Sequence, residues 1–451
     1  MRKNEIVPLS ITDIAQDGNG VGRYEGMVVF VPMTAPGDEI EARIVKVLKH
    51  HAYGIVARIT SASPHRETPS CPVYKRCGGC SLQHLSYPAE LSLKSNWVRE
   101  NLARIGHLQP QLEAPIPSPQ SQQYRNKAQY PIRRQNGHIT AGFFAKRSHD
   151  LVPVADCILQ PAVFADIVGT VCAFLEETGL DPYDEADGTG LVRCLYLRRA
   201  DATGQIMVCL VINGGGIPGE QDLVSRLTAA FPAIATIVLN INRQRGNAIL
   251  GDSERILYGD GKIRDILSGV SVELSAKSFY QVNHDGAQLL YQKALEYAAP
   301  QADDLLLDLY CGAGTIGLSM AAQAGRVLGV EIVEEAVTDA RANAARNGIA
   351  NAEFLCADAS GAVLELQGRG ISPAVVVLDP PRKGTTPEAI RSIVEMHPKR
   401  VVYVSCNSAT LARDCALFRE YGYMLTKAVT VDMFPRTAHV ECVVLMTKVE
   451  E

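Results

Sequence analysis

From residue 269 onward the chain alternates short apolar stretches with helical patterns, and this alternation constrains the fold more than any other feature of the sequence. The stretches LLLDL, RVLGV, AVVVL and RVVYV consist largely of aliphatic residues, as expected of strands that are buried on both faces. Strands that alternate with helices form a parallel sheet, and such strands end along one common edge. We therefore predict a Rossmann-like α/β domain over residues 269–451.

A glycine-rich turn follows the first of these strands, in LLLDLYCGAGTIGL. Glycine lets the backbone approach a ligand closely, and the start of a helix offers unpaired N–H groups. The next strand ends in Glu331, which suits ribose hydroxyls, and the third ends in Asp358, near where an adenine edge would lie. These residues predict a nucleotide-binding site.

The same glycines fit the G-x-G-x-x-G pattern of NAD-binding proteins. Two downstream features argue against a dehydrogenase: Asp379-Pro380-Pro381-Arg382 follows the fourth strand, and Cys406 follows the fifth. A dehydrogenase has no use for this pair at strand ends. The pattern D-x-Y-C-G-x-G instead resembles the S-adenosylmethionine loop of class I methyltransferases.

Cys406 is one of twelve cysteines, and the motifs around it distinguish it from the others. A thiol at a strand end, a nucleotide-binding turn and the carboxylate of Glu441 together indicate covalent chemistry on a nucleotide base. Uracil is a weak nucleophile at C5, and addition of a thiolate at C6 would activate that carbon. A base must then remove the C5 proton before the thiol leaves.

The motifs LDPPRKG, SCN and HVE resemble those of the RNA uracil-5-methyltransferase family, which is similar to this chain along nearly its full length. The resemblance implies that Cys406 is the nucleophile and Glu441 the proton acceptor. It also implies a set of residues that contact S-adenosylmethionine: Gln281, Tyr310, Thr315, Glu331, Asp358 and Asp379. The sequence departs from the family at Arg436, where glutamine is frequent, and it leaves open whether Arg382 contacts substrate or holds its loop.

Residues 1–61 contain short alternating strands separated by glycines and a Pro-Gly pair, a pattern typical of a small β-barrel. The segment GNGVGR followed by VFVPMTAPGDEIEARI resembles the TRAM module, an RNA-binding barrel of the OB type. We expect residues 62–268 to form a central α+β domain, with an amphipathic helix at 89–106 that packs on the catalytic domain and a Pro/Gln-rich loop after it.

A cysteine cluster opens the central region, with Cys71, Cys77 and Cys80 in CPVYKRCGGC and Cys157 as the expected fourth thiolate. The spacing alone allows a zinc ion or a [4Fe–4S] cluster. Larger members of the resembled family carry a [4Fe–4S] cluster with this spacing, and the resemblance therefore favours the cluster in a structural role.

Charge is unevenly distributed along the chain. The whole protein has a formal net charge of −5, but residues 61–150 contain 12 basic and 5 acidic side chains. We expect this basic region to bind RNA, with Tyr124 and Tyr130 as platforms for base stacking. The basic residues of this region include Arg125, Lys127, Arg133, Arg134, Lys146 and Arg147.

These features predict an S-adenosylmethionine-dependent enzyme that methylates uridine C5 in RNA. The barrel and the cluster favour large-subunit (23S) ribosomal RNA as the substrate. The alternatives are a transfer RNA methyltransferase and a non-catalytic RNA-binding or ribosome-assembly factor. No run reaches the roughly 18 apolar residues of a membrane span, and the N-terminus is not a signal peptide, so we expect a cytoplasmic protein without an obligate protein partner.

Overall fold

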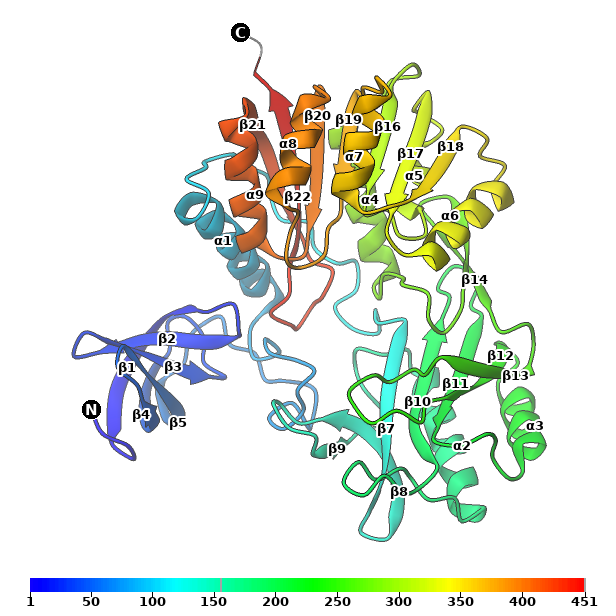
Figure 1. Ribbon diagram of the computed structural model, residues 1–451. Helices are drawn as coiled ribbons and strands as arrows, with labels where there is room; N and C mark the ends of the chain where they lie inside the picture. The colour runs from blue at the N-terminus through cyan, green and yellow to red at the C-terminus, as the bar shows by residue number, and fades with distance from the viewer. Residues whose placement is uncertain (155, 450–451) are drawn as a thin grey trace.

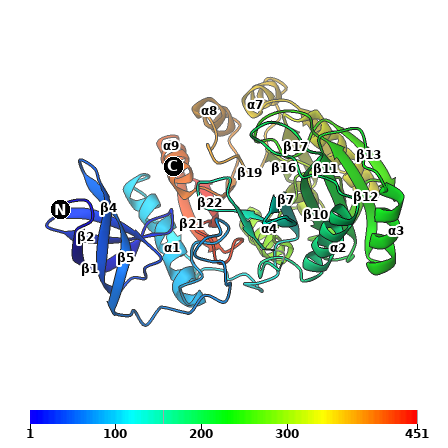
Figure 2. The same cartoon turned by 90° about the horizontal axis from the view of Figure 1, so that it is seen from below.

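The computed structural model describes residues 1–154 and 156–449. Figure 1 shows a small β-barrel, a central sheet domain and a larger α/β domain, with the N-terminus in the barrel. Seen from below, the barrel and the central domain lie on opposite sides of the C-terminal strands (Figure 2). No helix among the described residues is long and apolar enough to cross a membrane.

The N-terminal barrel is closed, with strand order β1-β2-β3-β5-β4, as predicted. In β1, the side chains of Val7, Leu9 and Ile11 are buried while the residues between them are exposed, because alternate residues of a strand face opposite sides. Gly20 is required at its position, since a Cβ there would lie 1.9 Å from Thr34 Oγ1. The strands are β1 (Ile6–Ile14), β2 (Asn19–Tyr24), β3 (Met27–Pro32), β4 (Glu39–Val47) and β5 (His51–Ser61).

Helix α1 (Tyr87–Arg104) joins the barrel to the C-terminal domain. Pro88 lies in its first turn, where the missing N–H has no intrahelical partner in any case. Trp97 donates from Nε1 to the carbonyl of Ile14 at 2.7 Å, and the helix packs against α9 (Ser408–Glu420). The segment after α1, which we expected to be a loop, contributes β6 (Gln111–Leu112), paired parallel to β21 (Tyr423–Val431) at the edge of the C-terminal sheet.

The central domain is a seven-stranded sheet of order β13-β12-β11-β10-β7-β8-β9, packed against α2 (Val163–Glu177) and α3 (Glu220–Ala230). Only the pair β11–β12 is parallel among the pairs of this sheet in the described residues. The hairpin β14 (Ile263–Leu267) and β15 (Val270–Leu274) leads into the C-terminal domain. The sheet strands are β7 (Lys127–Gln135), β8 (His138–Phe144), β9 (Leu151–Pro153), β10 (Val192–Arg199), β11 (Ile206–Ile212), β12 (Ile234–Ile241) and β13 (Ser253–Tyr258).

The C-terminal sheet has the order β18-β17-β16-β19-β20-β22-β21-β6, and the strands from β18 to β20 are parallel. The predicted Rossmann-like architecture is therefore confirmed, with β22 antiparallel to both β20 and β21. The remaining elements are β16 (Leu305–Leu309), β17 (Arg326–Glu331), β18 (Ala352–Cys356), β19 (Val375–Leu378), β20 (Arg400–Ser405), β22 (Glu441–Lys448), α4 (His284–Ala298), α5 (Thr315–Met320), α6 (Glu334–Arg346), α7 (Ala359–Gly368) and α8 (Pro387–Glu395).

The two faces of this sheet have separate cores. Val375 and Val377 of β19 pack with α4, α5 and α6, whereas Val376 and Leu378 pack with α1, α7, α8 and α9. Because both faces are covered, every residue of β19 is buried, as its uninterrupted apolar sequence predicts. This double cover leaves the carboxyl ends of the strands as the open edge.

Candidate active site

Three predicted site segments meet at the carboxyl edge of the sheet. Parallel pairing sets Leu309 beside Leu378 and Leu378 beside Tyr403. The residues that follow these strands, Tyr310 and Asp379 among them, therefore lie along one edge. The strand register therefore brings three segments together at this edge: the glycine turn, the Asp-Pro-Pro-Arg segment and the Ser-Cys-Asn turn.

The thiol of Cys406 and the carboxyl group of Glu441 lie close together across an antiparallel pair. Ser405 pairs with Cys442, so the next residue of each strand, Cys406 and Glu441, continues the same register. Burial raises the pKa of the half-buried Cys406 thiol, the carboxylates of Glu441 and Asp379 raise it further, and Arg382 opposes them. The nucleophile and the acid–base group predicted from the sequence are thus brought to one place.

Glu441 is almost completely buried, with 6% of its surface exposed. Burial raises the pKa of this carboxyl group well above its ordinary range, and the charge of Asp379 adds to the shift while Arg382 opposes it. A carboxylate with a raised pKa is a stronger proton acceptor once it is ionised. The environment of Glu441 suits proton transfer.

Asp379 is the centre of an acidic pocket. Burial raises the pKa of its carboxyl group to about 7. Its charge in turn raises the pKa values of Asp308, Cys406 and Glu441. Several acidic groups that are forced together in a desolvated pocket favour a positively charged ligand.

The glycine turn is held by Asp308 and Glu331. Asp308 Oδ2 accepts the N–H of Gly317 at 2.9 Å, and a Cβ on Gly317 would lie 2.8 Å from that oxygen. Glu331 Oε2 accepts the N–H of Gly312 at 3.1 Å. Burial raises the pKa of Asp308 to about 7, and its Oδ1 lacks a hydrogen-bond partner among the described residues. Asp308 is the first residue of the D-x-Y-C-G-x-G pattern, but sequence reasoning assigned it no role because it reads as one polar residue inside a buried strand.

The other predicted cofactor residues surround this turn. Tyr310 has a positive φ of 64° and its hydroxyl lies 2.7 Å from that of Thr385. Thr315 begins α5, with its hydroxyl 3.1 Å from that of Tyr291. Asp358 begins α7 as its N-cap and accepts the N–H of Gly361 at 3.0 Å.

Gln281 lies in the segment that precedes α4. Its backbone carbonyl accepts a hydrogen bond from Asn126 Nδ2 at 3.0 Å. The buried Arg198 of the central domain donates to the carbonyls of Ser275 and Ser278, both at 2.8 Å. The central domain therefore fixes the approach of Gln281 to the C-terminal domain.

Asn407 is a second residue that sequence reasoning passed over. Its Oδ1 accepts the N–H groups of Ala409 and Thr410 at 3.1 and 3.4 Å, and its Nδ2 donates to the carbonyl of Arg382 at 3.1 Å. It thus caps α9 and ties the loop of Arg382 to the turn of Cys406. An asparagine directly before a helix is the signal that could have identified this cap.

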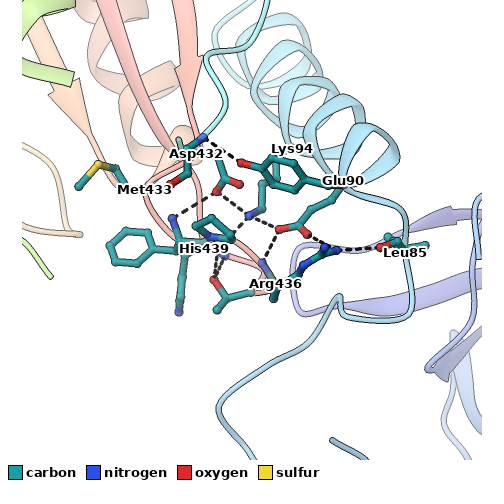
Figure 3. Close-up of polar contacts among 12 residues, drawn as sticks. Leu85, Glu90, Lys94, Asp432, Met433, Arg436 and His439 are labelled. Atoms are coloured by element: carbon teal, nitrogen blue, oxygen red, sulfur yellow. Dashed lines mark hydrogen bonds and ion pairs between the residues drawn. The ribbon is translucent and has the colours of Figure 1, made fainter. Parts of the chain in front are cut away.

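The loop of residues 432–440 connects β21 to β22 and leads directly into Glu441. It is held by a buried charged cluster on α1 (Figure 3). Lys94 Nζ donates to Glu90 Oε1 at 2.7 Å and to Asp432 Oδ1 at 2.8 Å. Glu90 Oε1 also accepts the backbone N–H of Arg436 at 2.7 Å.

The four predicted metal ligands line one cavity of about 300 Å³. Burial raises the pKa of the Cys80 thiol to about 12 and that of Cys157 to about 11, and the neighbouring thiols of the set add to both shifts. Gly79 donates its N–H to Cys77 Sγ at 3.4 Å. Within residues 1–154 and 156–449, no group of three or more His, Cys, Asp or Glu side chains is spaced to hold a single metal ion.

The basic region is only partly available to a ligand. Arg133 pairs with Glu185 at 2.7 Å, and Arg134 lies 3.2 Å from Asp181. Tyr124 and Tyr130 are buried, with 6% and 0% of their surfaces exposed, so the prediction that they stack on bases is wrong. Both face the protein interior. Arg125 and Lys127 line the cysteine cavity instead.

Comparison with known proteins agrees with this geometry. A family model described as tRNA (Uracil-5-)-methyltransferase matches residues 268–449, and the TRAM domain model matches residues 2–57. The chain is 39% identical to an uncharacterized RNA methyltransferase of Bacillus cereus over 100% of this chain and 98% of that protein. It is 41% identical to one of Streptococcus agalactiae over 99% of this chain and 100% of that protein.

A solved structure is similar along the same length. The Pyrococcus abyssi tRNA (uracil-54, C5)-methyltransferase, in complex with S-adenosyl-L-homocysteine, superimposes with a TM-score of 0.78 at 28% identity. The match covers 98% of this chain and 100% of that one. Its arrangement of domains is therefore shared by the chain described here.

Proposed function

The chain belongs to the RNA uracil-5-methyltransferase family, and we propose that it methylates C5 of a uridine in large-subunit ribosomal RNA with Cys406 as nucleophile. The observation that supports the proposed mechanism is the pairing of Ser405 with Cys442, which brings the neighbouring Cys406 and Glu441 close enough for Glu441 and Asp379 to raise the pKa of the thiol. S-adenosylmethionine supplies the methyl group as an electrophile.

The roles of the side chains follow from their surroundings. Cys406 attacks C6 of the uracil as a thiolate, and this addition makes C5 nucleophilic. Arg382 is the neighbouring cation that lowers the pKa of Cys406, and we assign to it the stabilisation of the thiolate. After methylation, Glu441 accepts the C5 proton and the thiol is eliminated.

The residues proposed to bind S-adenosylmethionine surround the glycine turn. A sulfonium ion is positively charged, which fits the acidic pocket around Asp379. The unpaired Oδ1 of Asp308 and the close approach at Gly317 fit a ligand lying on the turn. The proposed contacts are Gln281, Tyr310, Thr315, Glu331, Asp358 and Asp379.

We propose that Cys71, Cys77, Cys80 and Cys157 hold a [4Fe–4S] cluster. A zinc ion would draw its thiolates to within about 2.3 Å of itself. The four thiols line one cavity of about 300 Å³, which has room for a group larger than a single ion. The N–H of Gly79 near Cys77 supplies the kind of hydrogen bond that tunes cluster sulfurs. The proposed role is structural, since methyl transfer requires no electron.

The choice of RNA rests on the combination of the barrel with the cysteine set. It favours ribosomal RNA by analogy, whereas the name of the Pyrococcus abyssi protein favours the alternative, transfer RNA. Either substrate fits the cytoplasmic location that we propose.

One experiment tests the substrate. Anaerobically purified protein is incubated with methyl-labelled S-adenosylmethionine and with unmodified 23S ribosomal RNA or transfer RNA, and labelled nucleosides are identified by mass spectrometry. We expect 5-methyluridine in the ribosomal RNA. Label in transfer RNA alone would refute the proposed substrate, and binding without label would favour the non-catalytic RNA-binding factor.

A further inference from the structure

The loop of residues 432–440 is held mainly from outside the C-terminal domain. Three consecutive carbonyl groups each accept a hydrogen bond from residues 81–124. Phe434 accepts from Lys94 Nζ at 3.1 Å, and Pro435 accepts from Tyr124 Oη at 2.9 Å. Arg436 accepts the N–H groups of Ser81 and Leu82 at 2.9 and 3.1 Å.

Lys94 is the centre of these contacts (Figure 3). Its side chain, like those of Glu90 and Asp432, is 0% exposed. A buried ion pair is expensive to desolvate, and an apolar side chain of similar volume fills such a space at least as well. Packing alone therefore does not explain a lysine at position 94. Its three hydrogen bonds, one within α1 and two to the 432–440 loop, explain it.

Arg436 completes the network at its far end. Its guanidinium donates to the carbonyl of Leu85 at 3.0 Å and lies 3.7 Å from Glu90 Oε2. It also lies 4.0 Å from the exposed carboxylate of Glu67, so the network joins two buried carboxylates and one exposed carboxylate to two cations. Arg436 also has a positive φ of 67°, a backbone conformation that persists in a non-glycine residue when its surroundings enforce it. Its N–H is held by Glu90 and its carbonyl by the segment that follows Cys80.

The far end of this loop lies between two functional regions. Thr437 and His439 line the cysteine cavity, and Glu441 follows only two residues after His439. Any displacement of Asp432 or Arg436 is transmitted along this short segment to the carboxylate of Glu441. Cys406, by contrast, follows β20 in the turn before α9, and Lys94, Glu90 and Asp432 make no hydrogen bond to that turn among the described residues.

We propose that Lys94, together with Glu90 and Asp432, is a positioning residue that fixes the 432–440 loop and thereby the carboxylate of Glu441 for the elimination step. The inference rests on the proposed role of Glu441 as proton acceptor. It separates two halves of the reaction: addition by Cys406 is independent of Lys94, and proton removal from C5 depends on it.

The test uses the full chain and the variant Lys94→Met, which keeps the apolar stem and removes the donor. We expect turnover to fall at least tenfold, the KM for RNA to stay within about twofold of wild type, and a covalent protein–RNA adduct to accumulate on denaturing gels. Lys427→Met, an exposed lysine on β21, is the matched control and should behave as wild type.

Lys94→Met alone removes the cation that pairs with the buried Asp432 and leaves Glu90 with Arg436 at 3.7 Å, which destabilises the fold. The triple variant Lys94→Met, Glu90→Gln, Asp432→Asn replaces the lysine and the two buried carboxylates with uncharged side chains of similar size, while Arg436 keeps Glu67 at 4.0 Å. It should unfold within a few degrees of the wild-type temperature and still accumulate the adduct. This variant keeps the proposal testable if the single variant does not fold.

The outcomes separate the inference from the function it rests on. If wild-type protein forms no 5-methyluridine in any RNA, the proposed function fails. If wild type is active and the triple variant turns over normally, or loses activity through weaker RNA binding without an adduct, the positioning role of Lys94 is refuted and the function stands.

Discussion

Replacing Asp379 with asparagine should stabilise the free protein while weakening its cofactor site. Burial raises the pKa of this carboxyl group from 3.8 to about 7. The folded state therefore holds a proton that the unfolded state releases between pH 4 and pH 7. Because the pKa of Asp379 is higher in the folded than in the unfolded state, its contribution to stability is most favourable below the unfolded-state pKa. This contribution is lost as pH rises through the folded-state pKa.

The magnitude follows from the shift. The shift of about three pKa units destabilises the folded protein by about 4 kcal/mol at pH 8, since each unit is worth about 1.4 kcal/mol. At pH 5 the same shift destabilises the folded protein by about 1.7 kcal/mol, because the carboxyl group is then still protonated in the folded state. Asparagine has the same shape and no charge to desolvate, so Asp379→Asn should raise the free energy of unfolding by up to these amounts, with a gain that grows with pH.

Urea unfolding at pH 5 and pH 8 measures this difference. Asp303→Asn is the matched control, since Asp303 is exposed in the same domain, and it should change stability by less than about 0.5 kcal/mol at either pH. In parallel, calorimetric titration should show weaker binding of S-adenosylmethionine to the Asp379 variant, as expected when a site gives up stability for function. A variant that is no more stable than wild type at pH 8, or whose gain is independent of pH, would refute the acidic pocket described here.

Three further predictions concern the site and its support. Glu441→Gln should retain addition to RNA but not elimination, so that a covalent adduct accumulates on denaturing gels; rapid turnover by this variant would contradict its role. Gly314→Ala should destabilise the protein by about 1–3 kcal/mol, because Gly314 has a φ of 78° and a Cβ would lie 2.8 Å from Phe354. Gly348→Ala, at a φ of 64° with nothing within 4 Å of the new Cβ, should cost only about 1 kcal/mol in the same urea titration. Cys157→Ser should lower the iron and sulfide content of anaerobically purified protein and its visible absorbance, whereas Cys172→Ser should leave both unchanged; equal iron in the two variants would argue against the proposed ligand set.

Local patterns in the sequence were sufficient to place the predicted site residues along one edge of the sheet, because these residues lie at strand ends. The positions of Cys406 and Asp379 follow from where apolar runs stop, and parallel pairing does the rest. The glycine turn could be predicted in the same way. A Cβ atom on Gly314 would lie too close to Phe354, and one on Gly317 would lie too close to Asp308, so both positions require glycine. The closed barrel could be predicted from strand alternation and glycine spacing.

Contacts between distant segments were beyond local patterns. Glu90 and Lys94 are four residues apart, which is also the spacing of a solvent-exposed helical ion pair. Only the fold reveals that this pair is buried and that Asp432 joins it. Likewise, β6 consists of two residues whose pairing depends on the exposed edge of β21. Tyr130 is different: Ala128, Tyr130 and Ile132 alternate along β7, and this period of two should have indicated an inward-facing side chain.

The central claim, covalent attack by Cys406 on uracil, can be tested directly with RNA that carries 5-fluorouridine. Fluorine at C5 cannot be removed as a proton, so an adduct formed by addition and methylation should persist. We expect a protein–RNA adduct that requires S-adenosylmethionine, maps by mass spectrometry to the peptide of Cys406, and is absent from Cys406→Ala but present in Cys356→Ala, an exposed cysteine of the same domain. An active wild-type enzyme that forms no adduct, or an adduct that persists in Cys406→Ala, would contradict the account.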